Sequence, residues 1–190
     1  MLYYTGAAKY NAVQKDSSKS LGGYKSISTI NNNELHNVFS QITKQDIVNG
    51  DSFSVRLIVF ENPTTQNIQN IKIYTNESSI GKYELAVVTP SITKCDEFYF
   101  EKVDNENSLP YQGIFEQHLQ TNPLIIDELQ PQQLLGIWIK RVVEKDKFSP
   151  FETSTNMCCN CSDEFIEWLS QQQSNNQQSV QDLVLHIKWD

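Results

Sequence analysis

The most reactive side chains of the chain lie close together at Cys158, Cys159 and Cys161. Closely spaced thiolates are zinc ligands, and Cys95 or His186 would have to complete a tetrahedron around the ion. Structural zinc sites, however, are built from two spaced pairs of Cys or His, and the sequence holds no second pair. We therefore expect no bound metal, and free thiols in a partly buried insertion.

A cysteine nucleophile would need a histidine as its base. His36 lies on a predicted amphipathic helix, His118 lies in a long connection and His186 lies on the last predicted strand. None of the three belongs to a recognisable catalytic motif, and most histidines are ordinary surface or core residues. We therefore expect no thiol hydrolase activity.

The acidic pairs Asp96-Glu97, Asp127-Glu128 and Asp163-Glu164 suggest a second chemistry, glycoside hydrolysis. That reaction needs two carboxyl groups that face each other across a cleft. Sequence neighbours on a strand point to opposite faces, so we expect solvated surface charges instead. The segment Leu21-Gly22-Gly23 lacks the other residues of a phosphate-binding loop and predicts a tight bend. We expect a protein that is not an enzyme, with no catalytic residues, no cofactor and no metal.

Apolar side chains alternate with polar ones along six segments, a period typical of strands with one buried face. Asn, Pro, Gly and Ser separate the segments, which predicts an all-β fold, an antiparallel β-sandwich of roughly seven to nine strands. Residues 104–123 are polar and predict a long connection. The predicted strands are Phe53–Phe60, Ile71–Thr75, Tyr83–Val88, Phe98–Val103, Leu135–Val142 and Leu183–Trp189.

The alternation also predicts which side chains are buried. Leu135–Val142 is apolar on both faces until Lys140, so we expect it to be a central strand. In Phe53–Phe60, we assign Ser54 and Arg56 to the outer face. The residues that we expect in the core are Leu57, Ile73, Leu85, Ile137, Ile139, Leu185 and Ile187.

A chain of 190 residues fits one domain with some additional length. We expect an extended N-terminal arm over residues 1–32, which lack clear periodicity, and a single sandwich over residues 33–190. Apolar spacing predicts a short helix at 33–42. A polar, partly helical insertion is expected at about 144–180, with a second short helix near 162–170.

The chain is acidic, with a net charge of −8 from 15 basic and 23 acidic side chains. Without a basic cluster it cannot easily neutralise phosphates, so we expect no direct nucleic-acid binding. Its apolar runs are far shorter than the roughly 20 residues that cross a bilayer, and we expect neither a signal peptide nor a membrane partner. The crowded cysteines do not suggest a disulfide framework, which indicates synthesis in a reducing cytoplasm.

Three segments carry a resemblance to a known group of proteins. Ser20–Ser26 is followed by a short segment rich in Asn, Leu and Phe, then by Leu129–Arg141 and finally by Leu183–Asp190. In this order they resemble tailed-bacteriophage virion proteins, including some from crAss-like gut phages, although the group's usual turn glycine is absent at Pro131-Gln132. The resemblance implies an immunoglobulin-like sandwich in the virion, made in the host cytoplasm. It implies a repeated subunit of a head–tail ring or collar, a tail assembly or a capsid decoration.

Such a subunit acts through contacts with copies of itself and with other virion proteins, in a symmetric homo-oligomer. The tyrosines of residues 1–32 suit an arm buried against a neighbour, because tyrosine is favoured at interfaces. The alternative is a carbohydrate-binding or host-recognition module of the virion, since sandwiches serve both roles. Exposed aromatic residues in a shallow groove would favour that alternative.

Overall fold

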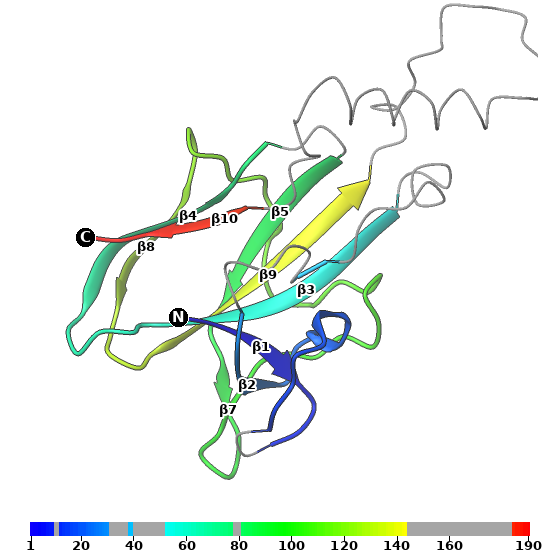
Figure 1. The fold of residues 1–190 in the computed structure, drawn as a ribbon, viewed down its shortest axis with the longest axis vertical. Coiled ribbons are helices and arrows are strands. Elements are labelled where there is room, and N and C mark those ends of the chain that lie inside the picture. The colour runs from blue at the N-terminus through cyan, green and yellow to red at the C-terminus, as the bar shows by residue number, and fades with distance from the viewer. Residues whose placement is uncertain (10–11, 31–37, 40–51, 78–80, 144–183) are drawn as a thin grey trace, which may run out of the picture.

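The structure, a computed structural model, describes residues 1–9, 12–30, 38–39, 52–77, 81–143 and 184–190. These residues contain ten strands and one short 3₁₀ helix, η1 (Figure 1). The elements are β1 (Leu2–Gly6), η1 (Ser17–Lys19), β2 (Tyr24–Thr29), β3 (Ser52–Glu61), β4 (Ile68–Thr75), β5 (Gly81–Val88), β6 (Ser91–Ile92), β7 (Phe98–Tyr99), β8 (Leu124–Leu129), β9 (Leu134–Val143) and β10 (Leu185–Lys188).

A five-stranded antiparallel sheet forms the centre of the fold, in the order β2-β1-β3-β9-β5. β9 pairs with β3 along its whole length and with β5 on its other side, which confirms the predicted central strand. A three-stranded sheet, β10-β4-β8, covers one face, and β6 and β7 form a separate hairpin (Figure 1). The predicted all-β sandwich is confirmed, whereas its immunoglobulin-like type stays a prediction.

Both faces of the five-stranded sheet are buried in hydrophobic cores. The first core lies between the sheets, where Ile58 and Ile137 meet Ile71 of β4. The second core joins Trp138 to Phe100, which follows β7 in the chain. Five of the predicted core residues are fully buried, namely Leu57, Ile73, Leu85, Ile137 and Ile139. The other two, Leu185 and Ile187, are partly buried against the first core.

Arg56 does not face solvent as the alternation predicts, because its residue is only 4% exposed. Its guanidinium carbon lies 5.5 Å from the centre of the Phe39 ring, and its Nη2 forms an ion pair with Glu106. The assignment of one face of this strand to solvent is wrong, because a core covers each side of β3. The carboxylate of Glu106 stabilises the buried cation.

The N-terminal segment belongs to the sheet of its own chain, so the extended arm expected over residues 1–32 is wrong for the described residues. Leu2 and Tyr3 of β1 pair with Phe60 and Val59 of β3, and β2 pairs with β1. The register of β1 against β2 shifts between Tyr3 and Thr5. A bulge of this kind breaks the alternation of two, which is why the sequence shows no periodicity here.

Four further expectations differ from the structure or cannot be assessed. Of the helix expected at 33–42, only Val38 and Phe39 are described, and they form a bend. The insertion at about 144–180, with its helix near 162–170, lies outside the described residues. The predicted strand Phe98–Val103 is shortened to β7, because Phe100 leaves the hairpin and bridges to Gly23 instead. The ten described strands exceed the expected seven to nine, and β1, β2, β6 and β8 lie outside the six segments that alternation identifies.

A pH-dependent ion pair links the edge strand β5 to its neighbour β9, beside the second core. Glu84 of β5 lies opposite Lys140 of β9, with Lys140 Nζ and Lys82 Nζ 2.8 and 2.9 Å from its carboxylate oxygens. Burial raises the pKa of Glu84, but hydrogen bonds and charges from the two lysines outweigh it and lower the pKa below its ordinary value. At pH values above the unfolded-state pKa of about 4.3, the ionised carboxylate therefore stabilises the folded state. This stabilisation is lost as the pH falls through the folded-state pKa, because the carboxylate becomes protonated.

We expect Glu84→Gln to lower the free energy of unfolding by about 1 kcal/mol near neutral pH, the scale of a cross-strand charge pair. The difference from the original chain should narrow as the pH falls below about 4. Urea denaturation at several pH values measures both effects. Asp127→Asn, at an exposed position of β8, is the control and should change neither the free energy of unfolding nor its dependence on pH. An equal loss for Glu84→Gln at all pH values would contradict the prediction.

Candidate functional site

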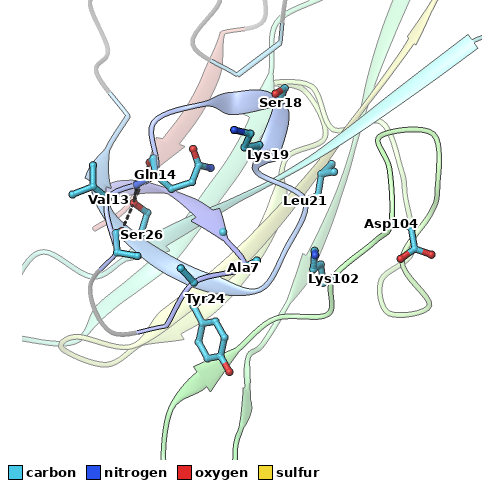
Figure 2. A pocket seen from close by; sticks show the side chains of 13 residues that line it. Ala7, Val13, Gln14, Ser18, Lys19, Leu21, Tyr24, Ser26, Lys102 and Asp104 are labelled. Atoms are coloured by element: carbon cyan, nitrogen blue, oxygen red, sulfur yellow. Dashed lines mark hydrogen bonds between the residues drawn. The ribbon is translucent and has the colours of Figure 1, made fainter.

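A cavity of about 440 Å³ lies beside β1 and β2, in the N-terminal segment (Figure 2). Much of its lining is apolar, and charged side chains also contribute to it. The apolar lining residues are Ala7, Ala8, Ala12, Val13, Leu21 and Tyr24, and the charged ones are Lys19, Lys102 and Asp104. The cavity volume falls within the range of small-molecule and side-chain binding sites.

Two glycines shape the chain at this cavity. Gly22 and Gly23 have φ angles of 96° and 94°, a left-handed conformation that favours glycine. A Cβ atom added to Gly22 would lie 2.0 Å from the carbonyl oxygen of Glu101. A Cβ atom added to Gly23 would lie 2.4 Å from the carbonyl oxygen of Gly6. The tight bend predicted at these glycines is therefore confirmed, and it allows two other segments to approach closely.

Buried hydroxyl groups tie the cavity-forming segments to β3. The Thr5 N–H donates to Ser20 Oγ at 2.9 Å, and Ser20 Oγ donates to the Leu57 carbonyl oxygen at 2.6 Å. The Gly22 N–H donates to Thr5 Oγ1 at 3.1 Å. Because buried polar groups are costly to leave unpaired, this network fixes the cavity wall to the folded core.

Gln14 adds a polar group to the cavity wall. Its Nε2 donates to the Thr5 carbonyl oxygen at 2.6 Å, and its backbone N–H donates to Ser26 Oγ at 2.9 Å. Its Oε1 is buried and accepts no hydrogen bond from any described residue. Figure 2 shows Gln14 and Ser26 side by side at the cavity. Gln14 and Ser26 therefore tie the segment after β1 to β1 and β2 through side chain–backbone hydrogen bonds.

The charge around the cavity is opposite in sign to that of the whole chain. Lys19 and Lys102 against Asp104 give the lining a net charge of +1. Residues 1–30 contain four lysines and one aspartate, a net charge of +3 in a chain of −8. The lining holds one carboxylate and no histidine, and its positive net charge attracts acidic groups.

A second candidate surface is an exposed apolar loop over residues 109–114, which we call the Tyr111 loop. Leu109, Tyr111 and Ile114 are 48%, 101% and 80% exposed. The Glu101 carboxylate accepts the backbone N–H of Tyr111 at 2.7 Å and that of Gln112 at 3.0 Å. These charge-assisted bonds hold the backbone of the loop while the apolar side chains face solvent.

The other end of the Tyr111 loop is also attached to the sheet. A Cβ on Gly113 would lie 2.9 Å from the Ala86 Cβ, so this glycine lets the loop approach β5 closely. Glu116 exchanges two backbone hydrogen bonds with Leu85, at 2.7 and 3.1 Å, and Phe115 packs against the second core. The loop therefore presents apolar side chains from a backbone held on both sides.

Sequence reasoning missed the Tyr111 loop, because residues 104–123 were expected only to connect two strands. The segment Leu109–Ile114 contains no charged residue, and three of its residues are the large apolar side chains Leu109, Tyr111 and Ile114. This uncharged stretch within a polar segment was the available signal. The anchoring carboxylate of Glu101 lies outside the segment and follows no local pattern.

The structure does not bring the predicted reactive side chains together where it describes them. Cys95 is a free, exposed thiol in the turn between β6 and β7. His118 lies in a loop with Nδ1 3.2 Å from the Asn122 carbonyl oxygen, and His186 of β10 stacks on Tyr74 with ring centres 4.7 Å apart. Within the described part of the chain, no group of three or more His, Cys, Asp or Glu residues is placed to hold a metal. Cys158, Cys159, Cys161 and His36 lie outside the described residues.

The acidic pairs occupy ordinary surface positions where they are described. Glu97 forms an ion pair with Lys9 at 3.4 Å, next to Asp96 in the hairpin turn. Asp127 and Glu128 are exposed on β8, at the edge of the three-stranded sheet. The third pair, Asp163-Glu164, lies outside the described residues. Asp96, Asp127 and Glu128 match the solvated surface charges that we expect, whereas the side chain of Glu97 is only 16% exposed.

Comparison with known proteins finds no family, no curated protein and no solved structure that matches this chain. Among the residues that the structure describes, no helix has the length and apolar character needed to cross a membrane. The two candidate surfaces, the N-terminal cavity and the Tyr111 loop, must therefore be interpreted from their own chemistry.

Proposed function

We propose that the protein is a non-catalytic structural subunit of a tailed-phage virion, and that it acts through contacts with copies of itself and with other virion proteins. The observation that carries this proposal is the Tyr111 loop. Apolar side chains that stay exposed on an anchored backbone are typical of interaction sites. The resemblance of Ser20–Ser26, Leu129–Arg141 and Leu183–Asp190 to virion proteins supplies the setting and the immunoglobulin-like type.

The physical chemistry of the loop favours protein–protein contact. Tyrosine is enriched at interfaces because it combines a large apolar area with a hydroxyl group. A backbone already ordered by Glu101 and Leu85 loses little conformational entropy on binding. More of the free energy from apolar burial is then available for association.

A carbohydrate-binding role is the second candidate, because Tyr24 lines a cavity with a polar rim. Stacking on a sugar would need an open face of that ring. The Tyr24 ring instead packs edge-on against Tyr99, with centres 5.1 Å apart, and Lys9 Nζ lies 5.6 Å from its centre. These neighbours favour the structural role over sugar binding.

Quantitative mass spectrometry of purified virions from a host culture that makes the protein tests the proposal. We expect the protein in a fixed number of copies per particle, because structural subunits occupy symmetric positions. Its absence from purified particles would contradict the proposal. Micromolar binding on a glycan array by protein that does not join particles would instead support the carbohydrate-binding role.

A further inference from the structure

We infer that the Tyr111 loop of one copy binds in the N-terminal cavity of the next copy. This inference rests on the proposed function and names the partner of the loop as a second copy of the chain. The two surfaces differ in form, since the loop projects Tyr111 and Ile114 while the cavity is recessed. One chain therefore carries both halves of a contact.

The apolar chemistry of the two surfaces is compatible. Ala7, Ala8, Val13 and Leu21 give the cavity small and aliphatic walls, and its volume of about 440 Å³ admits a tyrosine or isoleucine side chain. Burial of Tyr111 would remove from water an aromatic side chain that is now fully exposed. Lys19, Lys102 and Asp104 in the lining offer polar partners for its hydroxyl.

The charges of the two surfaces are complementary. Residues 105–116, which contain the Tyr111 loop, include two glutamates and no lysine or arginine; Glu106 pairs with Arg56, so Glu116 supplies the remaining negative charge. The cavity lining carries +1, from Lys19, Lys102 and Asp104. Opposite charge favours this pairing and disfavours two Tyr111 loops meeting each other, which would bring like charges together. Among copies of this chain, the cavity is therefore the better partner for the loop.

A contact between two different surfaces of identical chains is heterologous. Each copy can use its loop on one neighbour and its cavity on another, so the contact generates a ring when the rotation closes. This geometry suits a repeated subunit. It also predicts assemblies larger than a dimer, which a symmetric two-fold contact would not form.

Sedimentation velocity of the full chain over a range of concentrations is the test. We expect the original chain to associate as its concentration rises, and less at high salt. Tyr111→Ser removes the projecting side chain, and Ala8→Trp fills the cavity; both positions are exposed, so folding should be unchanged by circular dichroism. Each variant should need at least a tenfold higher concentration to associate. Ile125→Ser, at an exposed apolar position on β8, is the matched control and should associate like the original chain.

An equimolar mixture of the two variants gives the sharpest result. Tyr111→Ser retains its cavity and Ala8→Trp retains its loop, so the mixture should form a one-to-one dimer that does not grow further. A mixture that stays monomeric, variants that associate like the original chain, or an original chain that is monomeric throughout would each overturn the inference. If Tyr111→Ser enters purified particles at the normal copy number, the inference fails while the proposed function stands.

Discussion

A chain that lacks residues 1–30 is expected to lose its cooperative fold. The deletion removes β1 and β2, uncovers the edge of β3, and takes Tyr4 from the first core and Leu21 from the second. Loss of a large buried aromatic residue alone costs about 3–5 kcal/mol. Each buried polar group left unpaired adds about 1–3 kcal/mol, and the Leu57 carbonyl oxygen would lose Ser20. The sum is comparable to the ~5–15 kcal/mol that stabilises a typical domain.

Thermal unfolding followed by circular dichroism measures this effect, and the shortened chain should show no cooperative transition. Val13→Ser, an exposed substitution within the same segment, is the control and should melt like the original chain. A shortened chain that remains soluble and melts cooperatively would show that residues 1–30 are a dispensable arm after all.

Phe100→Ala is expected to lower the free energy of unfolding by about 3–5 kcal/mol. Phe100 is 1% exposed, packs in the second core with Trp138 and lies so close to β9 that a Cβ on Gly136 would be 2.6 Å from its ring. Its backbone also exchanges hydrogen bonds with Gly23, at 2.9 and 3.1 Å. Removing the ring would open a cavity on the face of the sheet that the three-stranded sheet does not cover.

Phe98 offers a matched control for this prediction, because it has the same side chain but is 48% exposed on β7. Phe98→Ala should change the free energy of unfolding by no more than about 0.5 kcal/mol. Urea denaturation of both variants gives the comparison. Equal losses for the two substitutions would contradict a second core built around Phe100.

The long strands could be predicted because their own side chains show the pattern. β9 is apolar on both faces, so its central place follows from its sequence, and β3, β4 and β5 are identified by alternation. β1 and β2 could not be found in this way, because the shift between Tyr3 and Thr5 breaks the alternation. Burial of Arg56 was hidden for a related reason, since its partner Glu106 comes from a distant loop.

The two candidate surfaces depend on contacts between residues far apart in the sequence. The bend at Gly22 and Gly23 was predicted, but the cavity needs the hydrogen bonds that join Thr5 and Ser20 to β3. The Tyr111 loop needs the carboxylate of Glu101 to hold its backbone. Local periodicity carries no information about such contacts. The sequence therefore predicts the bend, but it indicates only a connection at the Tyr111 loop.

We propose that the protein works as a repeated, non-catalytic subunit of a virion, and a reconstruction of the intact particle by electron cryo-microscopy tests this proposal. The proposal predicts symmetric copies in which β1 and β2 lie in the sheet of their own chain. It also predicts that the Tyr111 loop of each copy contacts a neighbouring protein. Particles that lack the protein would contradict it, and symmetric copies whose Tyr111 loop faces open solvent would overturn the assignment of this loop as the contact surface.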